Sequence, residues 1–315
     1  MNDKSLLVAT TALDYYGLEN AQLKRLGGAS NANFKVDIDN QSFVLRLHTC
    51  ALHDRDAISS ELAWLNSLHN ETTLVLPQPI VNLNGKLVTS VCTDGEPETL
   101  CTLMSWIEGK IPPTAEALTN QQLAEVGSIM AQLHKHSQHF ELPEDFRRHT
   151  FDAVHFSQRL EMLCTVLSNA EVNKSDLSGL QKLGDRIIAH FAQIERTPDN
   201  FGVIHADFHS GNYLLCGDKV HIIDFDRCGF GFYIYDLALA LMELEEHQRQ
   251  IFLQGYETIK QLPTDYANLK LFLCLAYLDN LGFFAPRPEE LVFIVKELPF
   301  VVAALRHAVK CSRIL

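Results

Sequence analysis

Two different hydrophobic periods divide the chain. Before about residue 107, short runs rich in β-branched and apolar residues are separated by turn residues, which is typical of strands. The runs that predict strands are 32–38, 42–47, 86–91 and 100–107. One segment differs, because apolar side chains recur every three or four positions over 57–68 and so predict a helix. This part of the chain therefore predicts a small antiparallel sheet with one helix.

The period becomes helical after the segment 109–113. Apolar residues then step by three or four over most of the remaining chain, with predicted helix breaks at Pro263, at Pro286 and Pro288, and near Pro299. One stretch is an exception: in 201–226, two short apolar runs flank a polar loop and would bring its side chains together if the runs paired as strands. The fold class predicted is α+β.

Lobe boundaries follow from this change of period. The pattern predicts a sheet-rich N-terminal lobe over 1–104, a hinge over 105–113 and a larger helical lobe over 114–315. The helical lobe carries the polar stretch, so it is expected to hold the catalytic and acceptor groups.

Charge narrows the classes of function. The 315 residues include 26 Lys and Arg against 39 Asp and Glu, a formal net charge of −13. A surface that gathers nucleic-acid phosphates or anionic lipid headgroups needs the opposite balance, so we expect neither nucleic acid nor membrane as a partner. The acidity suits general solubility and agrees with a cationic small molecule without selecting one. Oligomeric state is not predicted.

Cysteine usage and the N-terminal residues indicate the compartment. Eight cysteines form no C-x-x-C pair, which predicts free thiols in a reducing environment. Residues 1–20 lack the pattern of a signal peptide, and the longest apolar run, 271–278, is shorter than the roughly 20 residues that span a bilayer. We therefore expect a cytoplasmic protein.

The polar stretch combines the side chains that phosphoryl transfer uses. His205, Asp207 and Asn212 have the spacing H-x-D-x-x-x-x-N of a kinase catalytic loop, and Asp224 follows the next apolar run, where kinases place a metal-binding Asp. A carboxylate is needed to orient the acceptor hydroxyl, and hard oxygen ligands are needed for the metal ion that bridges the phosphates. Asp207 supplies the first, and Asn212 with Asp224 the second.

Longer runs around these residues resemble one family. The sequences HADFHSGN at 205–212, IDFD at 223–226 and YDLA at 235–238 are similar to those of the aminoglycoside phosphotransferase and choline kinase family, which shares the protein kinase fold. The similarity covers about 25–240, and the run 223–238 is most similar to the bacterial branch of homoserine kinase-like and stress-response kinases. It implies a bilobal kinase-like fold and an ATP- and Mg²⁺-dependent transfer of the γ-phosphoryl group to an alcohol.

The same resemblance implies a role for each site residue. Asp207 would be catalytic, and Asn212 and Asp224 would bind Mg²⁺. The nucleotide would be held by Gly28 and Ser30 in the phosphate loop and by the backbone at Ser105 and Ile107 around adenine. The supporting residues would be His205, His209, Asp226 and Asp236. His209 would either pack in the loop, which is favoured, or contact the substrate, and Asp226 would either make a second metal contact or stabilise the loop. The histidines at 134, 136 and 139 and the acidic run at 243–246 are expected to be solvated, although that run lies near the acceptor site in this fold.

One position departs from the family pattern. The strand at 42–47 carries Arg46 where better-known members have a Lys on the α and β phosphates, with Glu61 as the expected ion-pair partner. Arg stays charged and can bind phosphate through two N–H groups, but its fork changes the geometry. Lys35 on the preceding strand is the less favoured substitute.

The acceptor and two rival functions stay open. A small amino alcohol or amino-acid-like molecule is favoured, and a protein Ser/Thr acceptor is a further possibility. A nucleotide-binding homologue without catalysis would keep the fold and lose turnover. A metal-dependent hydrolase would instead use the imidazoles and carboxylates of 205–226 as metal ligands, namely His205, Asp207, His209, Asp224 and Asp226.

Overall fold

A computed structural model describes residues 3–26, 31–48, 54–93, 97–264 and 266–311. Its chain divides into two compact units. The first comprises Met1–Pro113, His139–Arg148 and Gly211–Asp226, and the second comprises Thr114–Gln138, His149–Ser210 and Arg227–Leu315. The lobe boundaries at 104 and 114 therefore remain a prediction from the sequence.

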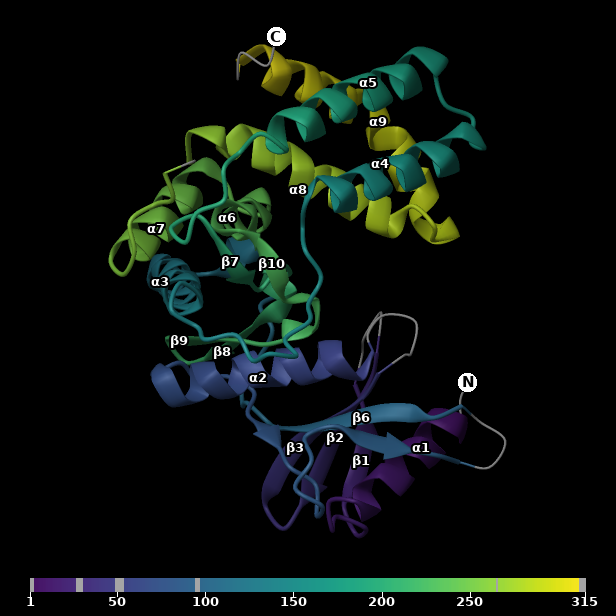
Figure 1. Cartoon of the computed structure of the whole chain (residues 1–315), viewed down its shortest axis with the longest axis vertical. Helices are drawn as coiled ribbons and strands as arrows, with labels where there is room; N and C mark the ends of the chain where they lie inside the picture. The colour runs from purple at the N-terminus through teal and green to yellow at the C-terminus, as the bar shows by residue number, and fades with distance from the viewer. Residues whose placement is uncertain (1–2, 27–30, 49–53, 94–96, 265, 312–315) are drawn as a thin grey trace. The chain divides into compact units, whose positions relative to one another are not determined.

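The first unit is built on an antiparallel sheet (Figure 1). Its strand order is β1-β2-β3-β6-β4, and β5 also pairs with β6. The strands are β1 (Gln22–Arg25), β2 (Ala32–Ile38), β3 (Gln41–His48), β4 (Pro79–Ile80), β5 (Thr89–Val91) and β6 (Thr99–Ser105). The prediction of a small antiparallel sheet is confirmed.

Two helices pack on opposite faces of this sheet. Side chains alternate along β3, so Leu45 and Leu47 face a core that they share with α1 (Asp3–Asp14), which the sequence did not predict. Arg46, between them, points to the other face and contacts α2 (Arg55–Glu71). The side chain of Asp54 caps α2 by accepting from the N–H of Ala57. The predicted helix over 57–68 is therefore confirmed and extended.

A short hairpin completes the first unit. β8 (Tyr213–Cys216) and β9 (Lys219–Ile222) pair across a turn in which Gly217 has a φ of +61°. The backbones of Leu215 and Lys110 exchange two hydrogen bonds, which attaches the hairpin to the chain after β6. Gly109 permits this close approach, because a Cβ there would lie 2.8 Å from the Cβ of Leu214.

The second unit is mainly helical around a two-stranded sheet of β7 (Phe201–Ile204) and β10 (Gly229–Phe232). The two runs predicted to flank the polar loop therefore do not pair with each other: 202–204 pairs with β10, and 220–223 pairs through β9 with β8. The helices are α3 (Asn120–Ser137), α4 (Ala153–Ser168), α5 (Lys174–Phe191), α6 (Tyr233–Met242), α7 (Glu246–Glu257), α8 (Leu269–Phe284) and α9 (Pro288–Cys311).

Aromatic rings form the centre of this unit. Phe191, Phe232 and Phe272 meet edge to face with ring centroids 5.4–5.7 Å apart, so one core joins α5, β10 and α8. α9 continues through Pro299, and the predicted break there is wrong. The apolar side chains of Leu298, Val301 and Leu305 are buried on both sides of the proline, which favours a continuous helix despite the lost N–H.

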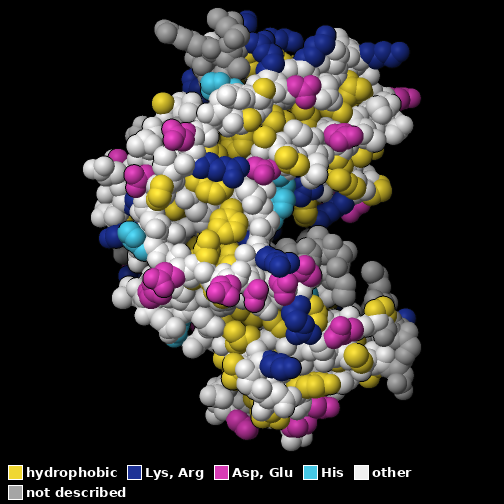
Figure 2. All heavy atoms as spheres, in the orientation of Figure 1, with side chains coloured by type: hydrophobic (Ala, Val, Ile, Leu, Met, Phe, Trp, Pro, Cys, Tyr) yellow, Lys and Arg dark blue, Asp and Glu magenta, His cyan; other side chains and the backbone are white. Residues whose placement is uncertain are grey.

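Both acidic and basic side chains lie at the surface, as the composition of the chain predicts. On the face shown in Figure 2, acidic and basic side chains are interspersed with apolar ones. Within the described residues, none of the helices has both the length and the apolar character needed to cross a membrane.

Candidate active site

A buried ion pair links β3 to α2 in the first unit. Arg46 Nη1 lies 2.8 Å from Glu61 Oε1, and these side chains are only 6% and 1% exposed. The expected pair is therefore present with Arg in place of Lys. Burial raises the pKa of the Glu61 carboxyl, and the Arg46 guanidinium opposes that shift. Removing one partner would leave a buried charge uncompensated.

The same guanidinium reaches the carboxylates that follow β9. Arg46 Nη2 lies 3.2 Å from Asp224 Oδ1, and Nη1 lies 3.6 Å from Asp226 Oδ1. Arg148, which the sequence did not single out, donates to the backbone carbonyls of Ala57 and Asp226. The segment 139–148 thereby ties α2 to the chain that carries Asp224, a link that no local pattern could have indicated.

Asn212 and Asp224 lie at one end of the β8–β9 hairpin. Asn212 precedes β8, and its carbonyl accepts from the N–H of Ile223, the residue before Asp224. Asp224 has a φ of +65°, and its side chain is 42% exposed. Its second oxygen, Oδ2, has no hydrogen-bond partner among the residues that the structure describes. The exposed carboxylate oxygen of Asp224 fits a hard divalent cation, and Asn212 lies close to it in the fold through its backbone bond to Ile223.

The two predicted hinge positions differ in whether their backbone N–H groups are already bonded. The N–H of Ser105 donates to the carbonyl of Gln78, so it is already used inside the sheet. Neither backbone group of Ile107 makes a hydrogen bond with any described residue.

Lys35, the less favoured substitute for Arg46, has other partners. Its Nζ lies 2.9 Å from Asp37 and 4.8 Å from the centroid of the Trp106 ring. Gly28 and Ser30 fall outside the described residues.

The polar loop after β7 belongs to the second unit. Ala206 has a φ of +61°, a conformation that costs an L-residue energy unless its surroundings hold it. Asp236, fully buried at the start of α6, provides this: its two oxygens accept from the N–H groups of His205 and Ala206 at 2.9 and 2.7 Å. The carboxylate thereby fixes the backbone that leads to Asp207.

Asp207 lies between an arginine and a histidine. Arg227 Nη1 is 3.2 Å from Asp207 Oδ1, and His209 Nε2 is 3.5 Å from Oδ2. Burial alone would raise the pKa of Asp207, but the hydrogen bond from His209 and the charge of Arg227 lower it to about 2. Asp207 is therefore ionised throughout the physiological range.

A second carboxylate, that of Asp279 in α8, also accepts a hydrogen bond from Arg227. It is fully buried and accepts from Tyr235 OH at 2.6 Å, His155 Nε2 at 2.8 Å, and the guanidinium groups of Arg159 and Arg227 at 2.9 Å. Burial would raise the pKa of Asp279, yet these donors hold it well below its usual range. No local pattern indicates this link, which joins two residues 52 positions apart.

One protein family matches most of the chain. The model of the phosphotransferase enzyme family matches residues 22–272. The chain belongs to this family. That membership confirms the prediction of a phosphotransferase and disfavours the metal-dependent hydrolase.

Curated relatives of this phosphotransferase are kinases. Amicoumacin kinase of Bacillus subtilis (strain 168) is 24% identical over 236 residues, which is 74% of this chain and 66% of the relative, just under two thirds of its length. Homoserine kinase of Neisseria meningitidis serogroup B (strain ATCC BAA-335 / MC58) is 22% identical over 85% of both chains.

Solved structures confirm the kinase-like fold. A microcompartment-associated aminopropanol kinase superposes with a TM-score of 0.80 and 25% identity, covering 98% of both chains. An amicoumacin kinase in complex with AMP-PNP, Ca²⁺ and Ami also gives a TM-score of 0.80, with 17% identity over 96% of this chain and 94% of that one.

His134 corrects an expectation. Its side chain is fully buried rather than solvated: the ring contacts Tyr256 OH at 2.9 Å and Asp236 Oδ2 at 3.2 Å. Burial lowers the pKa of His134, against the pull of Asp236. A helical position among Leu133, Met130 and Val126 could have indicated burial, but not the partner.

Glu243 belongs to the acidic run that was expected to be solvated. Its side chain accepts from the N–H of Ser210 at 2.8 Å.

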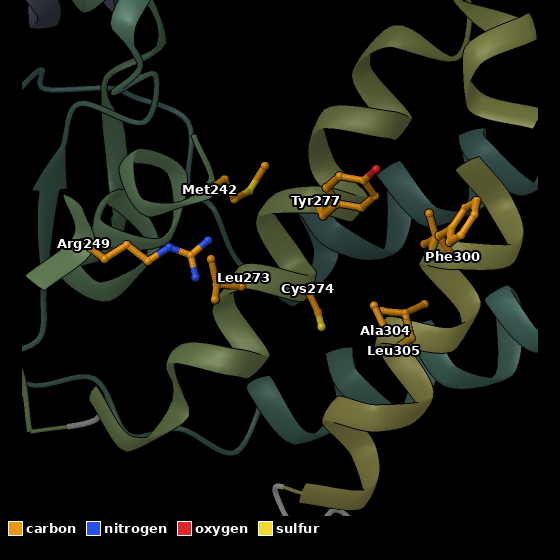
Figure 3. A pocket seen from close by; sticks show the side chains of 9 residues that line it. Met242, Arg249, Leu273, Cys274, Tyr277, Phe300, Ala304 and Leu305 are labelled. Carbon is orange, nitrogen blue, oxygen red and sulfur yellow. The ribbon is translucent and has the colours of Figure 1, made fainter. Parts of the chain in front are cut away.

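An apolar cavity of about 330 Å³ lies elsewhere in the second unit. Figure 3 shows Met242 and Arg249 on one side of it, Leu273, Cys274 and Tyr277 of α8, and Phe300, Ala304 and Leu305 of α9. None of the lining side chains is a carboxylate or a histidine. At 100° per residue, the α8 side chains of this cavity point away from Asp279, so the cavity is separate from the carboxylates around Asp207.

Proposed function

We propose that the chain is an ATP-dependent kinase that phosphorylates a hydroxyl group of a small molecule. The observation that carries this proposal is the convergence of Asn212, Asp224 and the Arg46–Glu61 pair at one end of the β8–β9 hairpin. Phosphate binding and metal binding need a fixed cation beside hard oxygen ligands, and this arrangement supplies both. The kinase relatives and the family assignment support the same reaction.

Each predicted site residue has a role in this reaction. Arg46, oriented by Glu61, binds the phosphates, and the unused backbone groups of Ile107 face the adenine. Gly28 and Ser30, which fall outside the described residues, would bind the phosphates as the resemblance implies, and Ser105 ends β6 before the hinge. His205, His209 and Asp236 hold the loop around Asp207, while Asp226 supports Arg46.

Asn212 and Asp224 would hold the divalent metal ion. Bound there, the ion would neutralise charge on the phosphates. The amicoumacin kinase structure with AMP-PNP and Ca²⁺ supports the use of a nucleotide and a divalent cation. We propose Mg²⁺ and ATP as the physiological pair and the cytoplasm as the compartment.

Asp207 is the proposed catalytic carboxylate. It accepts a hydrogen bond from the acceptor hydroxyl and aims the oxygen at the γ-phosphorus. The new O–P bond forms as the bond from the γ-phosphorus to the β–γ bridging oxygen breaks, ADP leaves with that bond's electrons, and the hydroxyl proton passes to Asp207. A carboxyl group with a pKa of about 2 is a weak base, so the proton moves late, after the O–P bond has made the hydroxyl acidic.

Calorimetry and turnover test this function. Titration of ATP with and without Mg²⁺ should show magnesium-dependent binding that Asp224→Ala weakens. Asp207→Ala should lower turnover by at least about 10³-fold while changing the affinity for ATP by less than about threefold, since Asp207 acts on the acceptor. Release of ADP with small hydroxyl compounds measures turnover.

The outcomes separate the alternatives. Near-normal turnover of Asp207→Ala would contradict the catalytic assignment. Magnesium-dependent binding of ATP without phosphorylation of any hydroxyl compound or protein Ser/Thr would instead indicate a nucleotide-binding homologue without catalysis.

A further inference from the structure

Three arginines lie around one aromatic ring, and one of them, Arg227, pairs with Asp207. The guanidinium carbons of Arg159, Arg227 and Arg287 lie 5.4, 5.4 and 5.0 Å from the centroid of Phe283, near the end of α8. Each guanidinium is within cation–π distance of the ring, which restrains it. Arg287 also stacks on Phe284, at 4.9 Å.

The carboxylates near this cluster do not balance its charge. Asp279 bonds Arg159 through Nε and Arg227 through Nη2, so one negative charge serves two arginines. Arg227 uses its other Nη for Asp207. Arg287 forms no ion pair with any residue that the structure describes, and the Nη groups of Arg159 bond to none of them. Positive charge therefore remains on the cluster, one member of which pairs with Asp207, in a chain whose net charge is −13.

These side chains are also accessible. Arg159 and Arg227 are 25% and 21% exposed, and the side chain of Asp207 is 24% exposed. Arg287 and Phe283 are half-buried. A small molecule that places a hydroxyl at Asp207 therefore meets guanidinium groups with open N–H edges on the same unit.

We propose that Arg159 and Arg287, stacked on Phe283, bind a carboxylate of the phosphoryl acceptor. The acceptor is then a hydroxyl-bearing carboxylic acid, such as an amino acid with a side-chain hydroxyl, rather than a simple amino alcohol. Arg227 and Asp279 are positioning residues, because they act through Asp207 and Arg159. This inference rests on the proposed kinase function and specifies its substrate class.

Acceptors that differ only in the carboxylate test the inference. Removing the carboxyl group converts L-homoserine into 3-amino-1-propanol and L-threonine into 1-amino-2-propanol, so each pair keeps its amine and hydroxyl. In ADP-release assays with Mg·ATP, the acid of at least one pair should have a kcat/KM at least about tenfold higher than its partner. A higher or equal kcat/KM for both amino alcohols would overturn the inference and leave the kinase function standing.

Variants of the arginines test whether these residues cause the preference for the acid. Arg287→Gln should lower the acid-to-amino-alcohol ratio of kcat/KM by at least about tenfold, mainly through KM for the acid. Arg159→Gln should do the same, but it also removes a bond to Asp279, so Arg287 is the cleaner test. Arg306, exposed on α9 and without a described partner, is the matched control: Arg306→Gln should change the ratio by less than about twofold.

Anion binding provides a second measurement that does not depend on turnover. Calorimetric titration of inorganic sulfate into the Mg·ADP-loaded enzyme should give a Kd that Arg287→Gln weakens at least about fivefold and Arg306→Gln does not. An unchanged Kd in Arg287→Gln would overturn the inference. If the enzyme phosphorylates none of the four acceptors, the change in the Kd for sulfate alone decides whether Arg287 binds an anion. Failure of the wild type to bind Mg·ATP would instead contradict the proposed function itself.

Discussion

At the scale of single residues, charge partners set the chemistry of the candidate site. Asp207 and Asp279 share Arg227, one on each Nη group. This chain of contacts keeps Asp207 ionised and oriented, although burial favours its neutral form. The stability that these two lowered pKa values supply is present above the usual pKa of Asp, near 4, and is lost as the pH falls below it.

We expect Arg227 to set the pH dependence of the proposed catalysis through Asp207. Arg227→Gln removes a charge that lowers the pKa of Asp207, so that pKa should rise from about 2 toward or above its ordinary value. We expect kcat of the variant to fall more steeply than that of the wild type between pH 6 and 4.5, by about threefold more. Steady-state kinetics over pH 4.5–8 measures this, with Arg227→Lys as the charge-preserving control. Parallel profiles would show that Arg227 does not act through Asp207.

Arg46 stands where better-known family members have a Lys, and variants at this position test whether its charge or its guanidinium shape is needed. Arg46→Met would leave Glu61 buried without its partner and remove the cation beside Asp224. We expect kcat/KM for ATP to drop by at least about 100-fold in Arg46→Met and by less than about tenfold in Arg46→Lys, which keeps the charge. Thermal unfolding of both variants checks the fold. Equal losses in Lys and Met variants would mean that the guanidinium fork itself is required.

At the scale of elements, two glycines bring α3 and α7 together. A Cβ on Gly127 would lie 2.0 Å from the carbonyl oxygen of Phe252, and one on Gly255 would lie 2.0 Å from that of Ala124. The backbones of the helices are thus in direct contact, and α3 also carries His134, which bonds Asp236. This packing supports the carboxylate that holds the loop before Asp207.

Substitution of these glycines should separate the helices. Gly127→Ala and Gly255→Ala each place a methyl group against backbone that cannot move aside, so we expect each to destabilise the fold by about 2 kcal/mol or more. Gly179→Ala on α5 is the matched control, because its Cβ meets only the side chain of Val302, whose methyl groups lie 3.0 and 3.9 Å away. Urea unfolding measures all three. A loss in Gly127→Ala no larger than in Gly179→Ala would contradict the close approach.

At the scale of the whole molecule, buried histidines make stability depend on pH. Burial lowers the pKa of His134, and burial together with the charge of His155 lowers that of His149 to about 4. The unfolded chain binds protons near pH 6.5, whereas these folded histidines do so only at lower pH. Stability is therefore unaffected above that pH and falls as the pH drops from 6.5 toward 4.

This dependence can be measured through one histidine. We expect the free energy of unfolding to fall between pH 6.5 and 4.5, with His134 contributing up to about 1.4 kcal/mol per pH unit. His134→Gln should be less stable at pH 7.5 because the contact with Asp236 is weakened, yet its stability should change less with pH. Denaturant titrations at several pH values provide the data. An unchanged slope in the variant would show that His134 does not titrate in this range.

The sequence by itself determined those features that neighbouring residues decide. Strands β2, β3 and β6, helix α2 and the change to helices in the second half follow from local periods of apolar side chains. The run from His205 to Asp224 indicated phosphoryl transfer because the spacing of a catalytic loop is itself local. The Arg46–Glu61 pair could be expected because both positions were recognised from the same family pattern.

Only the tertiary structure decided the partners of these residues. The pairing of β7 with β10, the burial of His134 and the bond of Arg148 to the carbonyl of Asp226 join segments that are distant along the chain. The same holds for Asp279, an acidic residue in an otherwise apolar helix, which binds donors from α4, α6 and Arg227. Such contacts depend on which surfaces pack together, and periodicity reports only that a face is apolar, not what covers it.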